Sequence, residues 1–177
     1  MRFLSTELPG VFVIEPEPRA DDRGLFARTF CREEFAAHGL CTEWVQCSAS
    51  FNTRAGTLRG MHWQCAPHEE VKLVRCTAGA AFDVVVDLRT DSPTFRKWVA
   101  VEITASNRKA VYIPGGCAHG FQTLVDGTEL FYQMSAFYVP EAACGARWDD
   151  PALGIVWPVC EKRVIAARDL SFPDLPT

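Results

Sequence analysis

The sequence predicts an all-β protein, built as an antiparallel barrel or as a two-sheet jelly roll. The middle of the chain consists of short runs rich in β-branched and aromatic residues, and turn-forming residues separate these runs. Helix candidates are few. Many brief strands with regularly spaced turns are typical of barrels and jelly rolls, whose interior or mouth can hold a small ligand.

The predicted strands are defined by their apolar runs and by the turns between them. They occupy residues 71–79, 81–89, 98–104, 109–114 and 128–135. The turn sequences TDSP, ASNR, PGG and VDGT separate them, and Asp126-Gly127 in the last of these predicts a tight hairpin. By contrast, residues 48–57 (SASFNTRAGT) form a polar run that is typical of a loop.

The two ends of the chain are predicted to be less regular. Residues 32–39 (REEFAAHG) form the best helix candidate, because acidic residues begin it and Gly39 can end it. Residues 148–176 are rich in Pro and Trp, so we expect this tail to pack over the barrel. With 177 residues and no repeat or linker, a single domain over residues 1–177 is expected.

The composition argues against several classes of protein. The charged fraction is 23% and the net charge is −4, which argues against a general nucleic-acid binder or a binder of anionic membranes. The first 18 residues do not follow a secretory-signal pattern, and no apolar run approaches the ~20 residues of a membrane helix, so we expect a cytoplasmic location. The eight cysteines form no C-x-x-C pair. We expect them to be free thiols, with disulfides as the alternative in a secreted protein.

His62 is the first candidate for chemistry. It lies between Met61 and Trp63, and Arg59 and Gly60 come just before. If residues 57–64 form a strand, strict alternation places Arg59 and His62 on opposite faces. A β-bulge at Gly60 would bring the two side chains to the same face.

Four other residues could take part in chemistry, although each also has a structural interpretation. Lys72 could be a solvated lysine, Tyr132 a half-buried strand residue and His119 a turn residue after PGG. Asp169 could cap a helix or face solvent. Taken singly, each is better explained by its structural interpretation.

Taken together, several motifs resemble one family over nearly the whole chain. They are DDRGLFARTF, RGMHWQ, KLVRCTAGAAFDVVVDLRTDSPTF, YIPGGCAHGFQTL, FYQMSAFYVPE, RWDDPALGIVWP and a final RD. Their order and spacing resemble those of the dTDP-4-dehydrorhamnose 3,5-epimerase family. The resemblance implies a cupin-type jelly-roll barrel with short peripheral helices, and a homodimer. It also implies a nucleotide-diphospho 4-keto-6-deoxyhexose as substrate, without a metal or a redox cofactor.

The resemblance further implies roles for individual residues. His62 would be the base and Tyr132 the acid, Asp169 would orient the His62 imidazole, and Lys72 would lie beside the keto oxygen. The implied substrate-binding residues are Arg23, Phe26, Gln46, Arg59, His119, Tyr138 and Arg168. Three positions depart from the residues usual in the family, and they concern substrate recognition rather than proton transfer: Arg28, Ser48 and Ala143.

Epimerisation beside a ketone explains why these residue types are needed. Removal of the C–H proton forms an enolate, which needs a base whose pKa is near neutrality and a positive group at the oxygen. Inversion then needs an acid on the opposite face of the sugar ring, and a tyrosine hydroxyl stays protonated until it is used. Arginine guanidinium groups match the oxygens of a diphosphate.

Three alternatives remain open from the sequence. A related sugar-nucleotide keto-isomerase could use much the same base. A metal-binding cupin could use His62 and His119, although two histidines are few for a catalytic metal site. A sugar-binding module would not need both Tyr132 and His62. Within the epimerase interpretation, inversion could occur at C3, at C5 or at both, and the nucleotide could differ from dTDP.

Overall fold

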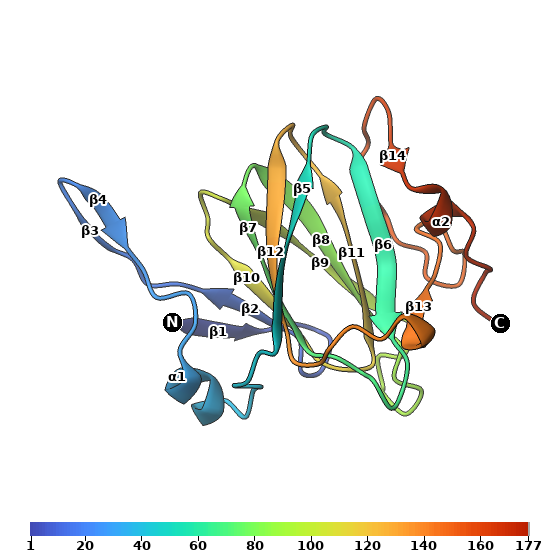
Figure 1. Ribbon diagram of the computed structural model, residues 1–177, viewed down its shortest axis with the longest axis horizontal. Coiled ribbons are helices and arrows are strands. Elements are labelled where there is room, and N and C mark those ends of the chain that lie inside the picture. Colours follow the sequence, from blue (N-terminus) through green and yellow to red (C-terminus); the bar gives the residue numbers. More distant parts are fainter. Residues whose placement is uncertain (177) are drawn as a thin grey trace.

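The computed structural model describes residues 1–176, which form two facing β-sheets with a hairpin at one end and an irregular tail at the other (Figure 1). The first sheet comprises, in spatial order, β1 (Arg2–Ser5), β2 (Phe12–Glu15), β10 (Ala110–Ile113), β7 (Lys72–Ala78), β12 (Thr128–Met134) and β5 (Gln46–Asn52). The second comprises β13 (Ala143–Gly145), β6 (Thr57–Gln64), β11 (Cys117–Thr123), β8 (Ala80–Asp87) and β9 (Trp98–Thr104), and the short β14 (Val164–Ile165) pairs with β6. Apart from the parallel β14–β6 pair, neighbouring strands are antiparallel, so the architecture is a jelly roll, as predicted.

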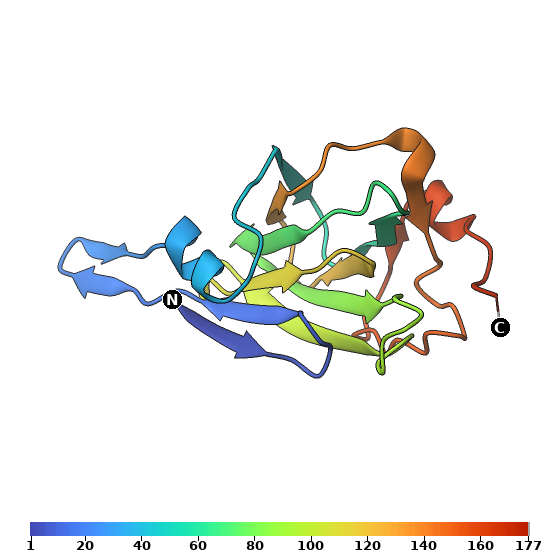
Figure 2. The same cartoon turned by 90° about the horizontal axis from the view of Figure 1, so that it is seen from below.

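The remaining elements lie outside the two sheets. β3 (Arg19–Asp21) and β4 (Gly24–Phe26) form a separate hairpin that projects away from the barrel in both Figure 1 and Figure 2. Helix α1 (Arg32–Ala37) follows the hairpin, a 3-10 turn spans Pro140–Ala142, and α2 (Ala167–Leu170) lies in the tail. The predicted helix is confirmed, and Gly39 follows it with a φ of +68°, a conformation that glycine adopts readily.

Two of the three apolar clusters formed by residues 1–176 hold the two sheets and the tail together. The first fills the space between the sheets and includes Val74, Val85 and Leu130, each at most 1% exposed. The second lies between the outer face of the β6 sheet and the tail, where Met61 packs with Trp157. Each fully buried side chain of this size contributes roughly 1.5–3 kcal/mol, so the tail is part of the core, as its composition predicted.

The predicted strands correspond to β7, β8, β9, β10 and β12, but two local predictions are wrong. The polar run at residues 48–57 is not a loop throughout, because β5 includes its first five residues. β5 is an edge strand with exposed side chains, which explains its polar composition. Asp126-Gly127 does not form a hairpin, because it connects β11 in one sheet to β12 in the other.

The expectation that every cysteine is a free thiol is also wrong. Cys65 and Cys144 form a disulfide with a Cα–Cα distance of 6.3 Å. The two lie close together because β13 pairs with the end of β6, where Cys144 lies opposite Trp63. The pairing connects residues 79 apart in sequence, so spacing within a motif could not reveal it.

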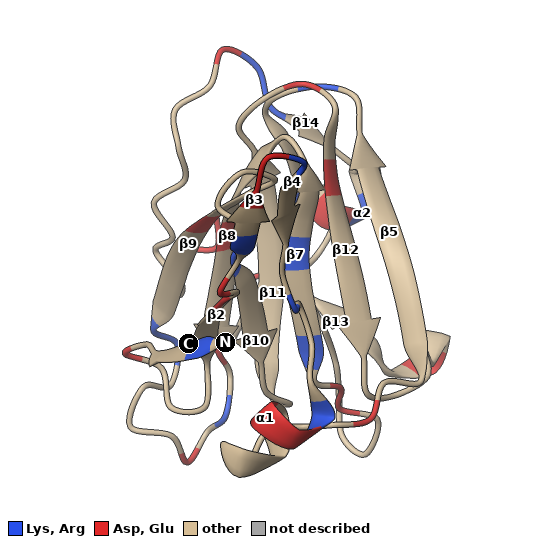
Figure 3. Cartoon of the chain, turned by 90° about the vertical axis from the view of Figure 1, so that its left-hand side faces the viewer, with Lys and Arg blue, Asp and Glu red and all other residues tan. Residues whose placement is uncertain are grey.

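The surface carries both signs of charge. On the side shown in Figure 3, Lys and Arg are interspersed with Asp and Glu. Among residues 1–176, no helix is long and apolar enough to cross a membrane.

Candidate active site

The site begins with an irregularity where β6 pairs with β11. Arg59 lies opposite Phe121 and His62 lies opposite His119, so two residues of β6 face the single Gly120 of β11. This is the β-bulge that the sequence suggested, and it places Arg59 and His62 on the same, interior face. A Cβ on Gly60 would lie 2.6 Å from the Gly120 Cα, so the close approach of the strands requires glycine here.

The His62 imidazole is held by a carboxylate from the tail. Its Nε2 lies 2.8 Å from Asp169 Oδ1, and the Gly60 N–H donates to Asp169 Oδ2 at 3.1 Å. Because the carboxylate accepts, Nε2 carries the proton and Nδ1 keeps its lone pair. Burial alone would raise the pKa of Asp169, but the bonds from His62 and Gly60 outweigh burial and lower it. The side chain of His62 is 42% exposed, so a ligand can reach it.

A second histidine–carboxylate pair lies deeper in the barrel. His119 Nε2 is 2.7 Å from Asp83 Oδ2, and both residues are at most 4% exposed. The other oxygen, Asp83 Oδ1, has no hydrogen-bond partner in the part of the chain that the structure describes. Burial raises the pKa of Asp83, and His119 partly opposes this effect.

Tyr132 lies against this buried pair. Its ring meets the His119 ring edge-on, with 5.7 Å between centroids. Desolvation, and then the nearby Asp83 carboxyl, raise the pKa of Tyr132 well above its usual value. The phenol therefore stays protonated at neutral pH. Since His119 is the cross-strand partner of His62, the structure brings His62, His119 and Tyr132 into one interior region.

Lys72 reaches the same interior from the first sheet. Val74, which belongs to the core, lies opposite Tyr132, and Lys72 is two residues earlier on β7, hence on the same face. Its side chain is 11% exposed, and Nζ pairs with Glu70 Oε1 at 2.6 Å. Lys72 thus supplies a nearly buried ammonium to the barrel interior.

The other predicted substrate residues fall into two groups. Arg59, whose Nε donates to Asn52 Oδ1 at 2.8 Å, lies on β6 of the barrel, and the exposed Arg168 lies on α2 of the tail, next to Asp169. Gln46 is also in the barrel, and its Oε1 accepts a hydrogen bond from the Tyr138 N–H at 2.5 Å. Tyr138 itself is 55% exposed.

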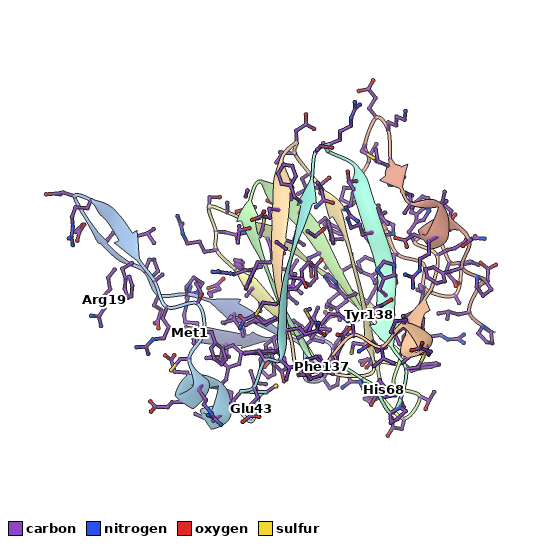
Figure 4. The ribbon with its side chains drawn as sticks, in the orientation of Figure 1. Met1, Arg19, Glu43, His68, Phe137 and Tyr138 are labelled. Atoms are coloured by element: carbon purple, nitrogen blue, oxygen red, sulfur yellow. A yellow bond between two sulfur atoms is a disulfide. The ribbon has the colours of Figure 1, made fainter. Side chains whose placement is uncertain are left out.

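Arg23 and Phe26 are not brought to this site within one chain. Both lie on the β3–β4 hairpin, which projects away from β6 (Figure 1). The Arg23 side chain is 90% exposed and pairs with Asp21, and Phe26 is 78% exposed. Figure 4 shows Arg19, on the same hairpin, far from Tyr138.

The positions that depart from the family's usual residues are also placed by the structure. Arg28 pairs with Glu34 at 2.9 Å beside the hairpin. Ser48 lies opposite Tyr132 on β5, and Ala143 lies opposite Gln64 on β13. Two of the three positions, Ser48 and Ala143, therefore lie directly opposite residues of the strands that carry the candidate site.

The sequence did not identify Asp83, Glu70 or Gln64 as part of this region. Asp83 could have been noticed, because an acidic residue inside the buried run AFDVVVD needs a partner. Glu70 and Gln64 carry no comparable signal. Among residues 1–176, no cluster of three or more His, Cys, Asp or Glu side chains is arranged to hold a metal ion.

The structure thus brings an imidazole oriented by a carboxylate, a protonated phenol and an ammonium to the interior of a jelly-roll barrel, and such groups can move protons to and from a bound molecule. The comparisons with known proteins identify the family. A family model described as dTDP-4-dehydrorhamnose 3,5-epimerase matches residues 5–177. An enzyme with that name from Sinorhizobium fredii is 41% identical over 99% of this chain and 90% of its own length.

Solved structures give the same result. The crystal structure of a dTDP-4-dehydrorhamnose 3,5-epimerase from Bacillus anthracis, with TDP and PPi bound, has a TM-score of 0.94 and 35% identity, covering 98% of this chain and 99% of the other. A 3′-monoepimerase from Streptomyces bikiniensis, in complex with dTDP-quinovose, has a TM-score of 0.90 and 34% identity, covering 97% and 86%. The chain belongs to the dTDP-4-dehydrorhamnose 3,5-epimerase family, and it is an epimerase.

Proposed function

We propose that this epimerase inverts C3, C5 or both of a dTDP-linked 4-keto-6-deoxyhexose by proton transfer through an enolate. One observation carries the mechanism. The imidazole that Asp169 orients shares the barrel interior with a phenol whose pKa is raised. A base and an acid that start in these protonation states are what inversion beside a ketone needs.

In the first step, His62 Nδ1 takes the proton from the carbon next to the ketone. The electrons of the broken C–H bond move onto the carbonyl oxygen, and the Lys72 ammonium stabilises the negative charge that forms there. Removing one such preorganised donor typically costs about 100–1000-fold in rate. Asp169 stabilises the imidazolium that results, because the carboxylate stays ionised at neutral pH.

In the second step, the Tyr132 hydroxyl donates its proton to the same carbon from the opposite face. The carbonyl re-forms, the configuration is inverted, and the substrate has gained and lost one proton. His62 then releases its proton and Tyr132 regains one, so the enzyme returns to its starting state. His119 packs edge-on against Tyr132, and we propose that the two rings together form part of the substrate-contacting wall.

The nucleotide would lie at the mouth of the barrel. Arg59 and Arg168 would contact the diphosphate, because guanidinium groups match phosphate oxygens. Gln46 and the exposed Tyr138 would contact the nucleoside, since a planar base stacks on an aromatic ring. The relatives solved with TDP and with dTDP-quinovose support a dTDP-linked substrate.

We also propose a homodimer in which the β3–β4 hairpin of each chain reaches the barrel of the other. Arg23 and Phe26 would then complete the nucleotide site from the partner subunit. The support is the projection of the hairpin and the exposure of Phe26, because an aromatic side chain 78% exposed on an extended arm favours a partner surface. The molar mass in solution, measured by light scattering, tests the dimer.

We propose a cytoplasmic location, where nucleoside-diphosphate sugars are made and used. The thiol state of Cys65 and Cys144 in cells tests this proposal, because disulfides are rare in a reducing cytoplasm. Free thiols would support the cytoplasmic location, and a stable disulfide would contradict it.

The decisive experiment follows solvent exchange. The protein is incubated with dTDP-4-keto-6-deoxyglucose in D₂O, and C3 and C5 are observed by NMR. Deuterium at both carbons with inverted configuration identifies a 3,5-epimerase, and deuterium at one carbon identifies a mono-epimerase. A carbonyl that moves to a neighbouring carbon would instead identify a keto-isomerase, and absence of exchange would contradict the proposal.

The same experiment separates the two proton-transfer residues. His62→Ala should abolish exchange, whereas Tyr132→Phe should retain some exchange but block inversion. A stoichiometric transition metal in protein purified without added metal would favour the metal-binding alternative.

A further inference from the structure

We propose that Gln64 is a positioning residue, which fixes the backbone on both sides of Tyr138 and so sets the affinity for the nucleotide. The inference rests on the proposed function in one respect, namely that Tyr138 contacts the nucleoside. Gln64 has no role in the proton-transfer chemistry derived above.

The side chain of Gln64 is buried, and its amide binds backbone atoms in three places. It is 3% exposed. Nε2 donates to the Phe137 carbonyl at 3.2 Å and to the His68 carbonyl at 3.0 Å, and Oε1 accepts from the Val139 N–H at 2.7 Å. One amide group therefore holds the residue before Tyr138 and the residue after it.

Tyr138 depends on this support because its ring cannot fix its own position by packing. Phe137 is 65% exposed and Tyr138 is 55% exposed. Figure 4 shows both side chains, together with His68, at the end of the barrel where β6 and β12 finish. The Tyr138 N–H is itself bonded to Gln46, so three successive residues are held through their main chain.

Strand pairing holds the far end of the same segment, with or without the disulfide between Cys65 and Cys144. The Cys65 N–H donates to the Ala142 carbonyl at 2.8 Å, and Ala143 of β13 lies opposite Gln64 of β6. Residues 137–145 are therefore attached at both ends to residues 64 and 65. His62 is two residues before Gln64 on β6, so the strand that carries the base also positions the segment that carries Tyr138.

The orientation of the amide makes the proposal testable with a nearly isosteric change. In Gln64→Glu, a carboxylate oxygen replaces Nε2 and faces the carbonyls of Phe137 and His68, so two hydrogen bonds become repulsive contacts. We expect the Kd for dTDP and the KM for the nucleotide-sugar to rise about tenfold, the loss of one base–aromatic contact. The kcat should change less than about threefold, because uniform binding is lost rather than transition-state binding.

Two controls separate positioning from general destabilisation. Gln122 is also a buried glutamine, 1% exposed, but its Nε2 donates to the Pro158 carbonyl and its Oε1 accepts from Arg163 Nε, both in the tail. Gln122→Glu places the same added charge against a buried carbonyl far from Tyr138 in sequence, with Arg163 beside it, and should not raise the KM. Inorganic pyrophosphate, which has no base, should bind the Gln64→Glu variant as tightly as it binds the wild type.

Hydrogen exchange gives a readout that does not require activity. The Val139 amide should exchange faster in Gln64→Glu than in Gln122→Glu. Equal Val139 exchange rates, or a KM no higher than that of Gln122→Glu, would overturn the inference. If wild-type protein neither binds dTDP nor turns over substrate, the proposed function fails, and the exchange rates still test how Gln64 holds the segment. If Gln64→Glu does not fold, Gln64→Leu, which removes the bonds without adding repulsion, takes its place with the same readouts.

Discussion

The two histidine–carboxylate pairs of the barrel use the same hydrogen bond in different surroundings. His62 and Asp169 join a strand to the tail at the rim of the interior, and the His62 side chain is 42% exposed. His119 and Asp83 join two neighbouring strands, and both are almost completely buried. The His62 imidazole is therefore open to solvent and can exchange protons with it, whereas the His119 imidazole is almost completely buried beside Tyr132.

The surroundings also shift the pKa values of the two carboxyl groups in opposite directions. The pKa of Asp169 is lowered because the bonds from His62 and Gly60 outweigh its burial, and the pKa of Asp83 is raised because burial outweighs His119. A hydrogen-bonded histidine–carboxylate pair is thus not a catalytic site by itself. Exposure, and the number of donors that face the carboxylate, decide what the pair can do.

The largest expected contrast comes from removing each imidazole in turn. His62→Ala should lower kcat by at least ~1000-fold, the scale of a general base, with little change in the free energy of unfolding. His119→Ala should cost about 3 kcal/mol of stability, because it leaves the Asp83 carboxyl buried without a partner. Steady-state kinetics and urea unfolding measure the two effects. Comparable stability losses in both variants would remove the distinction between the pairs.

A smaller contrast is expected when each carboxylate is replaced by its amide. Asp169→Asn should lower kcat ~100-fold, because the amide no longer stabilises the imidazolium that forms at His62. Asp83→Asn should change kcat less than about tenfold, because it acts on the substrate only through His119 and Tyr132. Kinetics with both variants at one pH decide the point, and a larger loss in Asp83→Asn would assign the main catalytic role to the buried pair.

The stability of the same two variants, relative to wild type, should change with pH in opposite directions. The lowered pKa of Asp169 gives stability that is present above its unfolded value of about 3.9 and is lost as the pH falls through the folded value. Asp169→Asn should therefore be less stable than wild type at pH 7, and the difference should shrink in acid. The raised pKa of Asp83 gives stability below about pH 3.9 that is lost as the pH rises. Asp83→Asn should therefore be more stable than wild type at pH 7, as denaturant titrations at several pH values would show.

The smallest expected effect is spectroscopic. Because desolvation raises the pKa of Tyr132, the neutral phenol stabilises the fold below about pH 10, and this contribution is lost as the pH rises through the folded value. Absorbance at 295 nm should show a phenol in the wild type that ionises late, and Tyr132→Phe should lack it. Tyr112, whose pKa burial also raises, should still ionise late in that variant. If the late-ionising part of the titration is the same in the wild type and in Tyr132→Phe, the Tyr132 phenol does not ionise late and must be in contact with water.

The strands could be predicted because their signals are local, and alternation and turns predicted β7, β8 and β12. The resemblance of motifs spread over the chain pointed to His62 and Tyr132, and the structure places both in one interior region. Contacts between distant segments could not be predicted from spacing. The Cys65–Cys144 disulfide depends on the pairing of β13 with β6, and the Asp126-Gly127 turn changes sheets because β11 and β12 pair with different neighbours. The three backbone bonds of Gln64 likewise exist only once residues 137–139 return to β6.

The bulge at Gly60 separates the requirements of the fold from those of the chemistry. Without the bulge, β6 would alternate strictly along its present length, which a strand between two apolar layers tolerates well. Because two residues separate Arg59 from His62, strict alternation would turn either the guanidinium or the imidazole out of the interior and into the layer beneath the tail. Such a chain would keep its barrel and lose the pairing of the two groups, so the register shift between β6 and β11 serves the site rather than the fold.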